Sequence, residues 1–183
     1  MRTIRWAGVA ALILSLNAAC LQAAEVTVKG VHLCCGGCVS AAQDALSEVK
    51  GVTDVAGDQN TKVIAFKATD DKTAKAAFDA LAKAGFHGAA FIDKKEASFP
   101  SINVKKGTTS NSITVTGVHL CCGACVTGVK KALEQVKGVD EMNIDREAKT
   151  VTVVGTDIDV NDFFAALYKG GYHGEMAKPA KKS

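Results

Sequence analysis

The segment GVHLCCGGC occupies residues 30–38, and the nearly identical segment GVHLCCGAC occupies residues 117–125. Each copy carries three sulfurs within five positions, which the core of a strand does not require. Each also carries two small residues next to one another, Gly-Gly or Gly-Ala, and glycine is a poor helix former. The repeated segment therefore predicts a loop that presents thiolates, once in each half of the chain.

The repeat extends well beyond these two loops. The sequence KGV at residues 50–52 returns at residues 137–139, and AGFHG at residues 84–88 returns as GGYHG at residues 170–174. Apolar residues spaced like one face of a helix also recur after each loop: Val39, Ala42, Leu46 and Val49 in the first copy, and Val126, Val129, Leu133 and Val136 in the second. The chain is therefore predicted to contain two copies of one structural unit.

Each unit shows the same order of predicted elements. In the first, a strand over residues 25–31 precedes the cysteine loop and a helix that ends at Gly51, a residue suited to the left-handed position after a helix. Strands follow at about residues 52–57 and 62–68, then a second helix and a short last strand. The second unit begins with a strand over residues 112–118. This β-α-β-β-α-β order predicts an α+β fold of two tandem ferredoxin-like domains.

The chain divides into five predicted segments. They are a signal peptide (1–24), the first domain (25–92), a polar linker (93–111), the second domain (112–176) and a basic tail (177–183).

The signal peptide is predicted from two arginines followed by an apolar run over residues 6–16, which is too short to span a bilayer. Cleavage is expected near residues 23–24. An imperfect lipoprotein box before Cys20 leaves lipid attachment there as an alternative. We therefore expect export to the periplasm or cell envelope, peripheral to the membrane at most.

The charge balance argues against a nucleic-acid partner. The chain has 22 basic and 19 acidic residues, and two of the basic ones, Arg2 and Arg5, lie in the predicted signal peptide. The rest of the chain is close to neutral, whereas nucleic-acid binding usually requires a strongly basic surface.

Six of the seven cysteines form two clusters, namely Cys34, Cys35 and Cys38 in the first unit and Cys121, Cys122 and Cys125 in the second. A disulfide framework would spread cysteines along the chain to close loops, so clustering disfavours it. Within each cluster a C-x-x-C pair lies at the start of a predicted helix, where the helix N-terminus favours thiolates. Soft thiolates select soft or borderline metal ions.

The C-x-x-C pair between the first strand and first helix, the KGV segment and the Gly-Phe or Gly-Tyr before the last strand resemble the heavy-metal-associated domain family. This resemblance implies a non-enzymatic metal-binding module that exchanges metal with a membrane metal transporter or another metallochaperone. Two features depart from the family. Cys34 and Cys121 are additional, in a loop about two residues longer, and Val31 and Val118 replace the usual methionine.

We therefore predict that each domain binds one soft ion through its three cysteines, with His32 and His119 as secondary candidates. Cu(I) is the first choice, and Hg(II) and Zn(II) are alternatives. Whether Cys34 and Cys121 are ligands or redox bystanders is left open. The alternative from another class is a thiol-disulfide oxidoreductase that uses the same C-x-x-C pairs.

Overall fold

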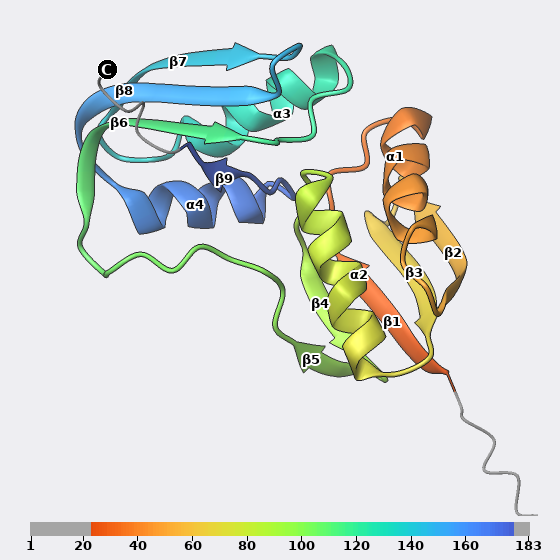
Figure 1. Ribbon diagram of the computed structural model, residues 1–183. Coiled ribbons are helices and arrows are strands. Elements are labelled where there is room, and N and C mark those ends of the chain that lie inside the picture. The colour runs from red at the N-terminus through yellow and green to blue at the C-terminus, as the bar shows by residue number, and fades with distance from the viewer. Residues whose placement is uncertain (1–22, 178–183) are drawn as a thin grey trace, which may run out of the picture.

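The computed structural model describes residues 23–177, which form two similar domains lying side by side (Figure 1). The predicted signal peptide up to residue 22 and the basic tail from residue 178 lie outside the described residues.

The first domain has the predicted order of strands and helices. Its elements are β1 (Ala24–Lys29), α1 (Gly36–Ser47), β2 (Val52–Asp58), β3 (Val63–Ala68), α2 (Asp71–Lys83) and β4 (Ala89–Ile92). The antiparallel sheet has the order β2-β3-β1-β4, extended at its edge by β5 (Lys95–Ala97).

The second domain repeats this topology. Its elements are β6 (Thr109–Thr116), α3 (Gly123–Leu133), β7 (Val139–Asp145), β8 (Thr150–Asp159), α4 (Val160–Lys169) and β9 (Glu175–Met176), with the sheet order β7-β8-β6-β9. The two α+β, ferredoxin-like β-α-β-β-α-β units predicted from the sequence are thereby confirmed. Gly51 has the expected left-handed backbone, with φ of 89°, and Gly138 repeats it in the second domain with φ of 86°.

The segment predicted as a linker, residues 93–111, is more ordered than its polar composition suggested. Its start turns back as a hairpin in which β5 pairs with β4, and Asp93 and Lys94 take positive φ values of 47° and 67° at the turn. Two successive positive φ values make a tight hairpin turn, which is usually marked by glycine. No glycine stands at this turn, so the sequence pattern did not reveal the hairpin. The end of the segment forms the first residues of β6.

The helices begin in two different ways. Asp70 and Asp159 cap α2 and α4, where their carboxylates accept hydrogen bonds from the backbone N–H groups of Thr73 at 2.7 Å and Asn161 at 2.8 Å. The other two helices, α1 and α3, have a cysteine at the N-cap position and no side-chain cap hydrogen bond. No side chain therefore caps the first turn of these two helices, which begins at the cysteine loops.

The two domains meet through equivalent segments that follow α2 and α4. The backbone N–H of His87 donates to the carbonyl of Gly171 at 3.1 Å, and the N–H of His173 donates to the carbonyl of Gly85 at 2.9 Å. Between them Phe86 and Tyr172 form an antiparallel bridge. Each domain therefore contributes the same turn to an approximately two-fold interface.

Both turns require glycine at this interface. Gly85 and Gly171 have φ of 86° and 84°, a conformation that other residues rarely adopt. A Cβ atom on Gly85 would collide with the backbone of His119, and one on Gly171 would collide with the backbone of His32. The absence of a side chain lets each turn approach the cysteine loop of the other domain.

The two aromatic residues of this interface differ by one hydroxyl, and the neighbouring helices differ accordingly. Tyr172 is buried and its hydroxyl donates to the carbonyl of Cys125 at 3.0 Å. Gly128, three residues after Cys125, leaves the space for that hydroxyl, because a Cβ there would collide with it. In the first domain the equivalent position after Cys38 is Ala41, and the equivalent aromatic residue is Phe86, which has no hydroxyl.

This pairing predicts a compensating double substitution. Gly128→Ala should lower the free energy of unfolding by about 1–3 kcal/mol through overpacking against Tyr172. Adding Tyr172→Phe should recover most of that loss, because it recreates the Ala41 and Phe86 combination of the first domain. Urea denaturation of the single and double variants measures the coupling. Losses that simply add would show that Gly128 does not accommodate the hydroxyl.

Candidate metal site

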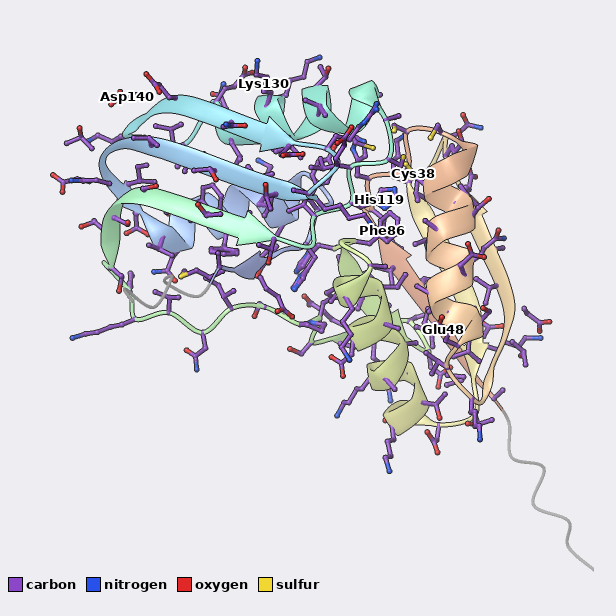
Figure 2. All side chains as sticks on the ribbon, turned by 45° about the horizontal axis from the view of Figure 1, so that its top comes forward. Cys38, Glu48, Phe86, His119, Lys130 and Asp140 are labelled. Atoms are coloured by element: carbon purple, nitrogen blue, oxygen red, sulfur yellow. The ribbon has the colours of Figure 1, made fainter. Side chains whose placement is uncertain are left out.

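The two cysteine loops converge at the domain interface. Each loop leads into the N-terminus of its helix, α1 or α3, and the two loops face each other across the boundary between the domains. Figure 2 shows Cys38 of the first domain beside His119 of the second, with Phe86 close by. All six described cysteines are free, and each sulfur lies within 4.0 Å of at least two others.

Within each loop the last cysteine contacts the other two. The Sγ atom of Cys38 lies 3.5 Å from that of Cys34 and 3.8 Å from that of Cys35. The second loop repeats these values, with Cys125 at 3.5 Å from Cys121 and 3.8 Å from Cys122. A disulfide requires about 2.05 Å, so these are contacts between thiols.

The contacts between the loops are equally short. Cys34 lies 3.6 Å from both Cys122 and Cys125, and Cys121 lies 3.8 Å from Cys35 and 3.6 Å from Cys38. The two last cysteines, Cys38 and Cys125, are 4.0 Å apart and fully buried. The structure thus brings all six predicted cysteines into one cluster, although the sequence repeat predicted a separate site in each unit.

The helix N-terminus acts on Cys122. The backbone N–H of Cys125 faces this sulfur and is the largest cause that lowers its pKa to about 6, followed by a contact with the Cys34 thiol. A free thiol has a pKa of about 8.5, so Cys122 is a thiolate at neutral pH. This is the helix-start effect expected from the sequence.

The remaining sulfurs do not all share this effect. Burial and the neighbouring sulfurs raise the pKa of Cys34 and Cys121, and burial raises that of Cys125. Burial also acts to raise the pKa of Cys38, but hydrogen bonds from Cys34 outweigh it and leave the pKa lowered. Thiolates this close repel one another, so the cluster is stable in its fully ionised form only with a cation among the sulfurs.

The two candidate histidines lie at the cluster, and each stacks on the other domain. His32 stacks on Tyr172 with ring centroids 4.4 Å apart, and His119 stacks on Phe86 at 4.3 Å. In both, Nε2 is buried without a hydrogen-bond partner. Burial, followed by the charges of Lys62 and His119, lowers the pKa of His32 to about 4. Burial is also the largest cause that lowers the pKa of His119. The lowered pKa of each histidine favours the neutral imidazole, which retains a lone pair.

The ligand atoms form groups that draw on both domains. Those of Cys38, His119, Cys121 and Cys125 all lie within 4.8 Å of one another. The same holds for His32, Cys34 and Cys125, and for Cys34, Cys35 and Cys122. Every one of these sets mixes the two loops, so residues predicted to act within one domain are arranged in space as one assembly.

Two lysines near the cluster were missed in the sequence. The Nζ atom of Lys62 donates to the carbonyl of Leu33 at 2.6 Å, and the charge of Lys149 is one cause of the lowered pKa of His119, after burial. Both have left-handed φ, 58° and 53°. The sequence repeat could have identified both, because Lys62 and Lys149 are separated by the same interval as the cysteine loops.

A model of the "Heavy-metal-associated domain" matches residues 25–87 and 113–173. The "Copper-transporting ATPase 2" of Rhizobium meliloti is 26% identical over 151 residues, which cover 81% of this chain and 16% of that protein. The "Heavy metal-associated isoprenylated plant protein 44" of Arabidopsis thaliana is 35% identical over 60 residues, covering 33% of this chain and 32% of the plant protein. The chain therefore spans less than a third of either relative.

The solved structures similar to this chain include oxidized MerP from Ralstonia metallidurans CH34, which is 25% identical with a TM-score of 0.34. The match covers 37% of this chain and 96% of the MerP chain. The N-terminal soluble domains of Bacillus subtilis CopA are 22% identical, with a TM-score of 0.33, covering 88% of this chain and 98% of their own. The family model gives no support to the oxidoreductase alternative. The family model covers more than half of the sequence, and the chain belongs to the heavy-metal-associated domain family, with two domains in tandem.

Proposed function

We propose that this protein is an exported carrier of a soft heavy-metal ion, most suitably Cu(I), which it scavenges for resistance or delivers to a membrane metal transporter or another metallochaperone. The observation that carries the proposal is the cluster of six free sulfurs at the starts of α1 and α3. Membership of the heavy-metal-associated family and similarity to a copper-transporting ATPase support it.

The donor set favours Cu(I) over the alternatives. Thiolates prefer soft ions, and Cu(I) is stable with only two or three sulfur ligands. Hg(II) shares this preference. Zn(II) usually requires four ligands in a closed tetrahedral site, and the set of Cys38, His119, Cys121 and Cys125 is the one that would supply them. The same six cysteines are thus the proposed ligands, with His32 and His119 in a secondary role.

The exposure of the sulfurs suits delivery. Cys38 and Cys125 are buried, whereas Cys35 and Cys122 are partly exposed and Cys121 is exposed. An incoming thiolate of a partner protein can therefore reach the bound ion from the outer side of the cluster while the buried sulfurs retain it. This stepwise exchange is a binding function, and we propose no catalytic role.

Export is part of the same proposal and rests on the apolar segment that precedes residue 23. In the described part of the chain, residues 23–177, no helix has the length and apolar character needed to cross a bilayer. Lipid attachment at Cys20 would be the peripheral alternative. Cell fractionation of the full chain, with and without residues 1–24, tests this part of the proposal.

Metal binding can be tested by anaerobic titration of the reduced protein with Cu(I), supplied as its acetonitrile complex against a chromogenic Cu(I) chelator. We expect two ions to be withdrawn from the chelator per chain. Replacing Cys35 and Cys38 by serine should leave one, because one C-x-x-C pair remains. Failure of the parent chain to compete with the chelator would refute the proposal.

We also expect that metal is not required for folding. Apart from Cys38 and Cys125, the buried apolar core consists of aliphatic and aromatic side chains from both domains. The metal-free, reduced protein should therefore show a cooperative thermal transition by circular dichroism. A transition that appears only after Zn(II) is added would favour a structural zinc protein instead.

A further inference from the structure

The additional cysteines contact the other domain more completely than their own. The Sγ atom of Cys34 makes a hydrogen-bond contact with Cys38 of its own C-x-x-C pair, and with both Cys122 and Cys125 of the other pair. The Sγ atom of Cys35 lies within 4.8 Å of it. Cys121 mirrors this arrangement: it reaches only Cys125 in its own loop, but both Cys35 and Cys38 across the interface.

The trios that cross the interface are nearly equilateral. Cys34 with Cys122 and Cys125 forms a triangle with edges of 3.6, 3.6 and 3.8 Å. Cys121 with Cys35 and Cys38 forms one with edges of 3.8, 3.6 and 3.8 Å. A triangle of this size places each sulfur about 2.1 Å from its centre, close to a metal–sulfur bond of about 2.3 Å.

The backbone explains why the additional cysteine does not complete its own pair in the same way. Cys35 and Cys122 are N-cap residues in an extended conformation, with φ of −155° and −150° and ψ of 171° and 173°. Successive side chains of an extended backbone point to opposite sides. The Sγ atom of Cys34 is directed to the facing loop, although it also lies within 4.8 Å of that of Cys35.

We propose that the third ligand of each metal site in this protein comes from the other domain. The C-x-x-C pair of each domain is completed to a three-sulfur site by the additional cysteine of the other domain, so that Cys34 serves the second domain and Cys121 serves the first. This inference rests on the proposed binding of a soft ion, and it assigns the role of the additional cysteines. Each bound ion then links the two domains.

Other contacts at the interface also join each cysteine loop to the opposite domain. His32 of the first domain covers Tyr172 of the second, and His119 of the second covers Phe86 of the first. The N–H of His32 also donates to the carbonyl of Gly171 at 3.3 Å. The segments that carry Cys34 and Cys121 are thus held by the opposite domain before an ion arrives, which lowers the entropy cost of recruiting the third sulfur.

The test uses the full reduced chain with one site removed. In the Cys35→Ser, Cys38→Ser background only the C-x-x-C pair of the second domain remains. Adding Cys34→Ser there should weaken Cu(I) binding, measured against the chromogenic chelator, by at least about tenfold, and X-ray absorption should show three sulfurs falling to two. Adding Cys121→Ser to the same background is the matched control and should have the smaller effect.

The reciprocal background, Cys122→Ser with Cys125→Ser, should reverse the order, with Cys121→Ser the more damaging change. It also keeps the test decisive if the first background folds poorly, which the circular-dichroism melt of each variant would reveal. Agreement between the two backgrounds supports the assignment of each additional cysteine to the metal site of the opposite domain.

Three outcomes would overturn the inference while leaving the proposed function intact. A greater loss with Cys121→Ser in the first background would mean that each loop supplies its own third ligand. Equal losses would mean a shared pool of sulfurs without assignment. No loss with either would mean two-sulfur sites. Absence of Cu(I) binding by the parent chain would refute the proposed function and the inference together.

Discussion

The close approach of two glycine turns to two cysteine loops is the contact on which the metal site depends. Gly85 and Gly171 carry no side chain, and their carbonyls accept hydrogen bonds from the facing turns. This contact sets the distance between the domains, and so it sets the distance between sulfurs that are far apart in the sequence. Without it, each domain would present an isolated three-cysteine loop.

The second constraint is electrostatic. Sulfurs packed within 3.5–4.0 Å cannot all be thiolates in the absence of a positive charge. The helix N-terminus stabilises the charge at Cys122, while burial disfavours it at Cys34 and Cys121. A soft cation removes this conflict, since coordination deprotonates thiols and neutralises their charge. The geometry of the cluster and its unequal ionisation therefore favour the same ligand.

Much of the fold was predictable because its signals are local and repeated. The apolar spacing after each loop defined α1 and α3, and Gly51 marked a position of left-handed backbone. The hairpin at Asp93 and Lys94 was not predictable, because its turn lacks the usual glycine. Lys62 and Lys149 were overlooked although they follow the repeat, since a lysine in a hairpin turn is usually only solvated.

The sequence by itself determined that two thiolate loops exist, that each lies at a helix start and that each belongs to the heavy-metal-associated family. These properties depend on residues close together in the chain. Only the tertiary structure decided that the loops face each other and that Cys34 contacts both cysteines of the second domain's pair. The orientation of two domains depends on steric and hydrogen-bond contacts between turns distant in sequence, and a repeat pattern carries no record of how its copies are placed against each other.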